Sequence, residues 1–318
     1  MEHKADGRFL YGTLKRCLGR ARISAELTLQ MHDPEPIQIR LLKESDIAAA
    51  MELKEFAGWN QTQSDWQLLL KLEPEGCFAA LLDDKVVGTT TTTCYGRELA
   101  WIGMVLVRPE RRRSGIATKL IKTALDYLQT KVETVKLDAT TQGRAVYEKL
   151  GFQVESCIER WSSTASSGPL MNEDASVQVS IDVAELAELF ELDRSAFNAD
   201  RSQLLNALIA SASVPTALAR SDDGSLTGYA FARPGSNADY VGPIVTVRPE
   251  QAGSLLDRML NQIGSRRVYI DYNTEFSNSN VLVGRGFIKE RDFIRMSRGK
   301  SSRRTSSSVF GIAGPEIG

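Results

Sequence analysis

Histidine is nearly absent from this chain, whose 318 residues contain only His3 and His32. Both lie near the N-terminus, in a segment without a clear apolar period. Ser-His-Asp and Cys-His catalysis need a histidine base, and many protein metal sites use histidine as a ligand. We therefore exclude these classes of site and expect no metal. The chemistry must then use tyrosine, carboxylates, backbone amides or water.

Three further features are missing from the sequence, and each excludes a class of protein: paired cysteine motifs, long apolar runs and a large net charge. The four cysteines, Cys17, Cys77, Cys94 and Cys157, show no CxxC spacing, and no signal peptide precedes them, so we expect reduced thiols in a cytoplasmic protein. No apolar run approaches the ~20 residues that span a bilayer, which excludes a membrane protein. With 39 basic and 40 acidic side chains there is no excess charge to attract nucleic acid.

The first 30 or so residues hold several Lys and Arg residues and few acids, which weakly resembles a transit peptide. The alternatives are an unstructured extension, or an upstream start codon with Met31 as the true first residue. We expect a flexible N-terminal extension over residues 1–36.

Apolar periodicity in the rest of the chain predicts alternating strands and helices. Strands are predicted at residues 37–42, 77–82, 86–95, 101–107, 135–139 and 151–161. Helices are predicted at residues 44–57, 64–72, 115–128 and 143–150. This order indicates an α/β fold with a mixed sheet flanked by helices, and we assign it to a first domain over residues 37–162.

The second half of the chain repeats the first. The sequence VLVRPE at 105–110 recurs as VTVRPE at 245–250, and VKLD at 135–138 recurs as VYID at 268–271. A Ser-, Thr- and Gly-rich linker is predicted at 163–175, a degenerate second domain at 176–300 and a disordered tail at 301–318. The repeat lacks the basic loop that follows residue 110 in the first copy.

That basic loop, RRSGIA at 112–117, joins a strand to an amphipathic helix. Free backbone N–H groups at a helix N-terminus bind anions, and the neighbouring arginines add charge for phosphates. Gly115 and Ala117 are small enough to let a ligand approach the main chain. The loop is therefore predicted to bind a phosphate-bearing ligand.

In these residues the chain resembles the GCN5-related N-acetyltransferase (GNAT) superfamily, whose signature Arg112, Gly115 and Ala117 match. The resemblance implies two tandem GNAT folds and acetyl-CoA as co-substrate. In that family the strand before the loop pairs with the pantetheine arm, and a bulge, here eased by Gly103, splays it from its neighbour. The implied cofactor-binding residues are Val105, Leu106, Val107, Arg112, Arg113, Ser114, Gly115, Ile116, Ala117 and Thr118.

The segment YEKLGF at 147–152 resembles a later motif of the family, whose tyrosine hydroxyl lies near the thioester sulfur. Tyr147 is the candidate general acid for the departing thiolate; the alternative is a tyrosine that packs its helix on the sheet. Asp138 is the candidate base, unless it pairs with Arg144. Thr140 and Gly143 stand where the family often has Asn and Ala.

Residues 37–300 resemble a narrower subfamily of two-domain acetyltransferases. In the superfamily, the acceptor pocket is built between the first strand and the second. Paired aromatic rings with a carboxylate suit an amine substrate. The alternative is that the tryptophan rings pack a helix on the sheet and the carboxylate caps a helix. The candidate substrate-binding residues are Trp59, Asn60, Gln61, Asp65 and Trp66. We predict an N-acetyltransferase in which a small-molecule or peptide amine attacks the thioester directly; the rival is a non-catalytic acyl-CoA-binding module.

Overall fold

The N-terminal half of the chain contains six strands of a mixed sheet. A computed structural model describes residues 37–164, 177–179, 183–276, 279–300 and 307–318. The elements of this half are β1 (Gln38–Leu41), η1 (Glu44–Asp46), α1 (Ile47–Ala57), α2 (Gln63–Leu72), β2 (Phe78–Leu82), β3 (Lys85–Tyr95), β4 (Leu99–Val107), η2 (Pro109–Arg111), α3 (Ile116–Leu128), β5 (Thr134–Ala139), α4 (Arg144–Lys149) and β6 (Gln153–Thr164).

The C-terminal half repeats the order β3-β4-α3-β5 as β9-β10-α7-β11, as the sequence repeat predicts. Its elements are β7 (Val177–Val179), α5 (Val183–Phe197), α6 (Ser202–Ala210), β8 (Ala217–Arg220), β9 (Leu226–Arg233), β10 (Asp239–Thr246), α7 (Gln251–Ile263), β11 (Arg267–Asn273), α8 (Asn280–Val283), β12 (Ile288–Gly299) and β13 (Val309–Gly311). None of the helices within these described ranges is long and apolar enough to cross a membrane.

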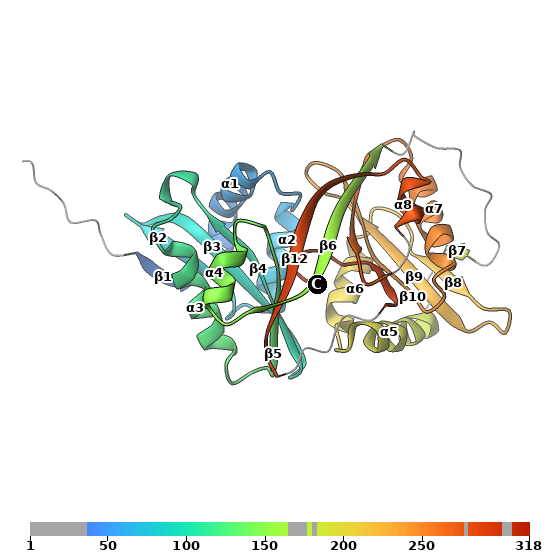
Figure 1. Cartoon of the computed structure of the whole chain (residues 1–318), viewed down its shortest axis with the longest axis horizontal. Helices are drawn as coiled ribbons and strands as arrows, with labels where there is room; N and C mark the ends of the chain where they lie inside the picture. Colours follow the sequence, from blue (N-terminus) through green and yellow to red (C-terminus); the bar gives the residue numbers. More distant parts are fainter. Residues whose placement is uncertain (1–36, 165–176, 180–182, 277–278, 301–306) are drawn as a thin grey trace, which may run out of the picture. The chain divides into compact units, whose positions relative to one another are not determined.

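The two halves share one sheet because they exchange strands (Figure 1). The described strands run in the order β1-β2-β3-β4-β5-β12-β6-β11-β13-β10-β9-β8-β7. Strand β12 of the C-terminal half pairs antiparallel with β5 and with β6. Strand β6 of the N-terminal half pairs antiparallel with β11 on its other side. Each half therefore depends on a strand of the other to complete its sheet.

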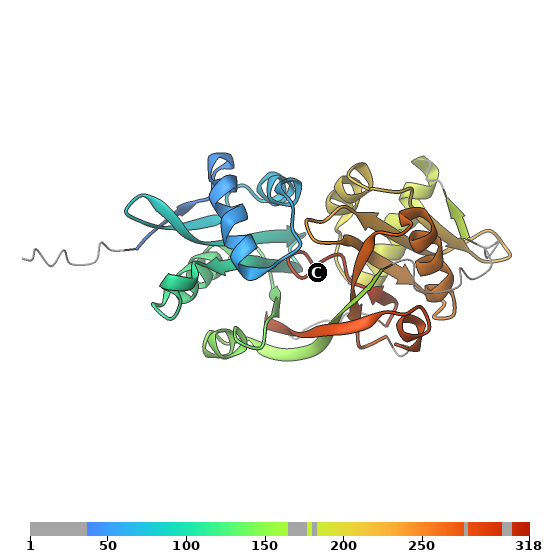
Figure 2. The same cartoon turned by 90° about the horizontal axis from the view of Figure 1, so that it is seen from above.

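Helices cover both faces of this sheet (Figure 2). The apolar side of α3 packs on one face of β2, β3 and β4, and its buried residues include Leu120, Ile121 and Ala124, as the predicted periodicity requires. Helices α1 and α2 pack on the opposite face around Trp66 and Trp101. Side chains of α5 and α6 join that same cluster, so the two halves have a common core.

The prediction of a disordered tail at 301–318 is wrong for residues 307–318. Residues 309–311 form β13, and nearly all of the residues from 309 onward are buried, including Phe310, Ile312 and Glu316. The Ser, Arg and Gly content of the whole tail suggested disorder, but the apolar residues from 309 onward pack into the sheet and the core. Strand β6 also extends to Thr164, into the predicted linker, while residues 1–36, 165–176 and 301–306 lie outside the described residues.

Candidate functional site

Strands β4 and β5 pair at one end and diverge toward the other. Their parallel pairs are Leu99 with Thr134, Ala100 with Val135 and Trp101 with Lys136, with no further pair among the described residues. The register of β4 against β3 shifts between Thr89 and Thr91, opposite a residue with positive φ, Met104 (φ 50°). This irregularity is a β-bulge, which explains the divergence. The expected bulge is present and leaves the later edge of β4 open.

Gly103 adjoins this bulge for a steric reason. A Cβ atom there would lie 2.5 Å from the backbone oxygen of Glu316, closer than real contacts allow. The glycine thus permits the segment that follows β13 to cross β4 at the divergence. This crossing brings residues from the end of the chain to the predicted site.

The loop at 111–115 is exposed and leads into α3. Arg113 (φ 63°) and Gly115 (φ 84°) adopt left-handed conformations, and a Cβ on Gly115 would meet nothing within 4 Å. Arg112 Nε donates a hydrogen bond to the carbonyl of Val107 over 3.3 Å, and Ser114 Oγ donates to the carbonyl of Arg111 over 2.6 Å. Because the first four N–H groups of a helix lack intrahelical partners, Ile116, Ala117 and Thr118 can offer donors to an anion here.

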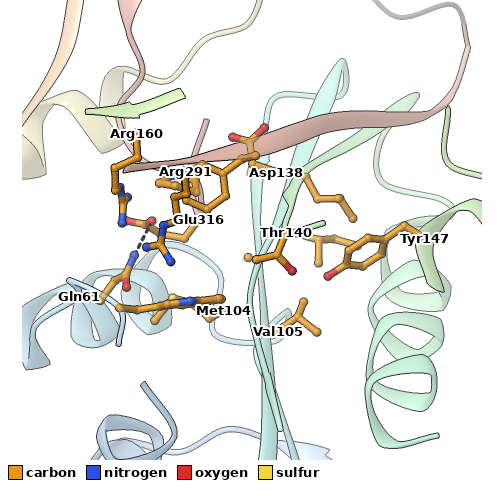
Figure 3. Close-up of a pocket in the computed structure, with 15 residues that line it drawn as sticks. Gln61, Met104, Val105, Asp138, Thr140, Tyr147, Arg160, Arg291 and Glu316 are labelled. Atoms are coloured by element: carbon orange, nitrogen blue, oxygen red, sulfur yellow. Dashed lines mark hydrogen bonds between the residues drawn. The ribbon is translucent and has the colours of Figure 1, made fainter. Parts of the chain in front are cut away.

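A cavity lies beside the open edge of β4, with a volume of about 570 Å³ including its mouth (Figure 3). It lies between the two halves of the chain and draws side chains from β4, β5, α4, β6, β12 and the terminal segment. The lining residues are Trp59, Gln61, Ile102, Gly103, Met104, Val105, Leu137, Asp138, Thr140, Tyr147, Arg160, Arg291, Phe293, Pro315 and Glu316.

Tyr147 points its hydroxyl into this cavity (Figure 3). Its ring is held edge-on by Phe152, with the ring centroids 6.0 Å apart, and burial raises the pKa of its hydroxyl. A Cβ on Gly143 would lie 2.9 Å from this ring, so the glycine gives the tyrosine its room. The structure gives the hydroxyl no hydrogen-bond partner among the described residues. The Tyr147 ring therefore packs against its surroundings, as the packing alternative expects, while its hydroxyl is left available to a ligand.

Asp138 lines the same cavity, but its carboxylate is committed to an ion pair. Both of its oxygens accept hydrogen bonds from Arg295 over 2.8 Å, and both side chains are fully buried. Burial raises the pKa of Asp138, and the Arg295 guanidinium opposes that rise. Arg144, the partner that the sequence offered as an alternative, pairs with Glu148 instead. Figure 3 shows the Asp138 carboxylate turned away from Tyr147.

The predicted acceptor residues are divided by the fold. Trp59 and Gln61 line the cavity, whereas Trp66 is fully buried in the core and does not line it, so its packing alternative holds. Asn60 donates to the carbonyl of Ala238 over 2.9 Å and accepts from two backbone amides of the C-terminal half. The Asn60 side chain therefore joins the two halves.

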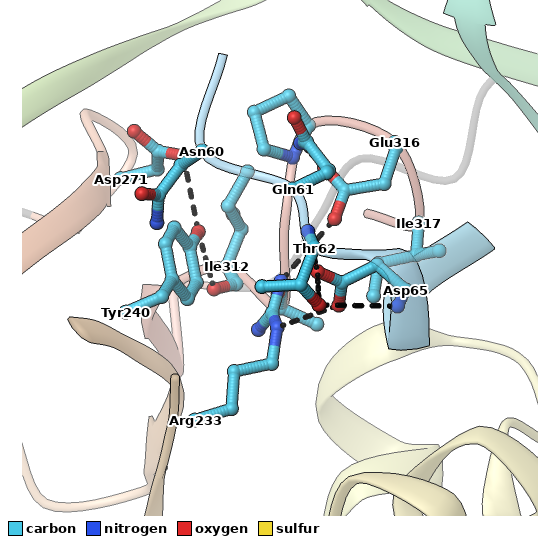
Figure 4. Close-up of polar contacts among 12 residues, drawn as sticks. Asn60, Gln61, Thr62, Asp65, Arg233, Tyr240, Asp271, Ile312, Glu316 and Ile317 are labelled. Carbon is cyan, nitrogen blue, oxygen red and sulfur yellow. Dashed lines mark hydrogen bonds and ion pairs between the residues drawn. The ribbon is translucent and has the colours of Figure 1, made fainter. Parts of the chain in front are cut away.

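Asp65 does two structural jobs (Figure 4). It accepts hydrogen bonds from the Thr62 backbone and hydroxyl, closing a capping box at the start of α2. It also lies 3.5 Å from Arg233, which in turn pairs with Glu316 over 3.2 Å. The capping alternative for Asp65 is confirmed, and Asn60 and Asp65 line only a smaller neighbouring cavity.

Sequence reasoning missed Arg160, Arg291, Phe293 and Glu316, which all line the cavity. Glu316 accepts a hydrogen bond from Gln61 over 2.8 Å, and burial raises the pKa of its carboxyl group. Three of these residues come from the C-terminal half, and only the strand exchange and the terminal segment bring them here. No spacing in the sequence signals that arrangement.

The C-terminal half has the matching divergence, but its own chain fills it. Strands β10 and β11 pair through Asp239 with Val268 and Tyr240 with Tyr269. Farther along, β13 pairs with both, through Ile244 with Gly311 and Tyr272 with Gly311. The open strand edge of the first copy thus has no counterpart in the second.

Comparison with known proteins agrees with this architecture. The profile of the Acetyltransferase (GNAT) family matches residues 45–152, and that of an Acetyltransferase (GNAT) domain matches residues 189–311. These matches define a protein with two acetyltransferase-type domains. The chain is a two-domain member of the GNAT superfamily, and the resemblance seen in the sequence is confirmed.

Named relatives fit the same assignment. The uncharacterized N-acetyltransferase YitH of Bacillus subtilis is 28% identical over 255 residues, covering 78% of this chain and 87% of the relative. A candidate acetyltransferase from Pyrococcus horikoshii superposes with a TM-score of 0.74 at 23% identity, covering 89% of this chain and 96% of its own. A tandem GNAT protein from the clavulanic acid biosynthesis pathway gives a TM-score of 0.60 at 16% identity, covering 84% and 99%. The two structural likenesses concern the fold.

Proposed function

We propose that this protein is an N-acetyltransferase that moves the acetyl group of acetyl-CoA to an amine acceptor. The observation that carries the proposal is the open edge of β4, which runs from the cavity at Val105 toward the exposed loop at 111–115. In the proposed complex the loop and the first turn of α3 hold the phosphates, and Val105, Leu106 and Val107 pair with the pantetheine arm. The acetyl thioester then lies in the cavity beside Tyr147.

The amine must lose a proton before it can attack. An alkylamine with a pKa of ~10.4 is uncharged at pH 7 at a cost of about 4.6 kcal/mol. Asp138 was the carboxylate that the sequence favoured as base, but its bond to Arg295 stabilises the charged form and weakens its basicity. We propose Glu316 instead, because its carboxylate accepts a single, longer hydrogen bond from an arginine, Arg233, over 3.2 Å, lines the cavity and has a pKa that burial raises.

The proposed transfer proceeds in one covalent exchange through a tetrahedral intermediate. Glu316 first takes the proton of the ammonium form and releases it to solvent. The neutral nitrogen then bonds to the acetyl carbon and gives its second proton to Glu316, which again returns it to solvent, and the carbon–sulfur bond breaks. Backbone N–H groups of the divergent β4 edge polarise the carbonyl. Tyr147 gives its proton to the leaving thiolate and recovers one from solvent. A tyrosine hydroxyl is protonated at neutral pH, so it can donate, and burial raises its pKa further.

Release of free CoA in the presence of a panel of amines tests the function. Amine-dependent thiol release that requires acetyl-CoA is expected. Binding of acetyl-CoA without thiol release for any amine would favour the non-catalytic acyl-CoA-binding module. A cytoplasmic location is part of the proposal, and it is supported by Cys77, Cys94 and Cys157, which are free thiols.

A further inference from the structure

Arg291 reaches the cavity from a distorted part of β12. Along the β12–β6 ladder Lys289 is opposite Trp161 and Arg291 is opposite Arg160, so Glu290 is an extra residue without a partner on β6. Such bulges change where the next side chain points. Here the bulge sets two guanidinium groups directly across from each other, and like charges in that position destabilise a sheet. The repulsion between Arg160 and Arg291 must therefore be offset by another interaction.

The two arginines differ in how their charge is compensated. Arg160 donates two hydrogen bonds to Asp271, over 2.7 and 2.6 Å. Arg291 forms no ion pair among the described residues, its Nε is buried without an acceptor, and its guanidinium carbon lies 5.1 Å from the centre of the Phe293 ring. Burial, with repulsion from Arg160 next, lowers the pKa of Arg291. Asp271 and Glu290 attract this cation from a distance, but it has no directly bonded counter-ion among the described residues.

The other charged groups that line the cavity are paired. Asp138 pairs with Arg295, Arg160 with Asp271, and Glu316 with Arg233. In the described lining, Arg291 thus contributes one uncompensated positive charge. Arg291 is half-buried, so leaving its charge without a counter-ion is unfavourable, and a planar guanidinium matches a carboxylate through two parallel hydrogen bonds. One uncompensated charge suits a single carboxylate better than a doubly charged phosphate.

Arg291 and Glu316 lie at one end of the cavity, and Tyr147 lies at the other (Figure 3). The end near Tyr147 is where the proposed function puts the thioester, so the end near Arg291 is left for the acceptor. Glu316 there suits an ammonium group, and Trp59, Met104 and Phe293 supply apolar walls. Because Arg233 is shared between Glu316 and Asp65, this end carries negative charge beside the Arg291 cation, which matches the two charges of an amino acid.

We infer that the acceptor is an amine that also carries a carboxylate, such as a free amino acid, and that Arg291 binds this carboxylate. The inference rests on the proposed function for the identity of the second substrate. It assigns substrate selection to a strand of the C-terminal half, which explains why the degenerate copy has kept its fold without its own open cofactor edge.

The experiment compares α- and ω-amino acids with their uncharged carboxamides. Binding is measured by calorimetry on the full-length protein with CoA, which does not react, and turnover by thiol release with acetyl-CoA. In the wild type we expect at least one amino acid to bind, and to react in kcat/KM, about 10- to 100-fold better than its carboxamide. In Arg291→Gln this preference should fall to about threefold or less, while the carboxamide values stay unchanged.

Two further variants guard the interpretation. Arg298→Gln removes an equal charge from an exposed position of the same strand and should keep the preference. Arg291→Lys keeps the charge but loses the planar fork, so an intermediate preference is expected. Arg291→Gln should be no less stable to heat than the wild type, because it removes a cation without a described partner.

The outcomes separate this inference from the proposed function. Thiol release without any preference for a carboxylate, or a preference that survives in Arg291→Gln, would overturn the inference and leave the acetyltransferase intact. Arg291-dependent binding of an amino acid without thiol release would overturn the acetyltransferase and leave the binding site. Absence of carboxylate-selective binding across the whole panel would also refute the inference.

Discussion

Replacing Tyr147 by Phe removes one hydroxyl and little else. The ring keeps its edge contact with Phe152, and no described group loses a hydrogen bond. Affinity for acetyl-CoA and stability should therefore stay close to the wild type. Turnover should fall by about 10²- to 10⁴-fold, the usual contribution of a general acid, which corresponds to about 3–5 kcal/mol in the activation barrier.

The pH profile gives the second readout for Tyr147→Phe. The hydroxyl donates only while it is protonated, so the rate should decline as pH rises through its pKa. Burial raises that pKa above the ordinary value of about 10, which puts the decline at pH above 10. The Phe variant should lack this limb, and thiol release measured at saturating substrates across alkaline pH checks it.

Tyr127→Phe is the matched control for this experiment. Tyr127 lies on α3 outside the cavity, and its hydroxyl donates to Glu73. The same chemical change there should leave turnover near the wild-type value. If Tyr147→Phe and Tyr127→Phe had the same turnover and the same pH profile, Tyr147 would be a packing residue and solvent would protonate the thiolate.

Four further outcomes follow from the same site. Gly115→Glu should abolish acetyl-CoA binding in a folded protein, whereas Gly224→Glu, also a left-handed glycine in open space, should bind normally; equal affinities by calorimetry would contradict the anion-binding loop. Calorimetry should give one acetyl-CoA per full-length chain, and two would show that the second copy binds as well. Gly103→Ala should destabilise the protein by about 1–3 kcal/mol in denaturant titrations and lower turnover, because its Cβ displaces the segment around Glu316; unchanged values would disprove that close packing matters. In the wild type, the rate should fall as pH drops through the pKa of Glu316, which burial raises above the usual ~4.3. Glu316→Gln should remove this acidic limb of the rate profile. An identical profile in the variant would exclude Glu316 as base.

The cofactor side of the candidate site was largely predictable because its signals are local. The loop at 112–117 follows a strand and opens a helix, and Tyr147 follows β5 within one short connection. Backbone amides and a neighbouring helix act within a few residues of one another, so motif and spacing are enough to locate them. The prediction of the acceptor site was partly wrong because an aromatic residue next to a carboxylate is not specific to a binding site. Trp66 packs in the core, and Asp65 caps α2.

The sequence by itself determined the two repeated folds, the amphipathic face of α3 and the single basic loop, because periodicity and turn chemistry depend on near neighbours along the chain. Only the tertiary structure decided which strands complete which sheet. Backbone hydrogen bonds between strands use the same groups in every residue and so do not specify the partner strand. The pairing of β12 and β6 with strands of the opposite half could therefore not be predicted from their residues alone. That exchange, with the terminal segment crossing β4 at Gly103, brings Arg291 and Glu316 to the cavity. Long-range pairing, rather than any local motif, therefore fixed the acceptor end of the site.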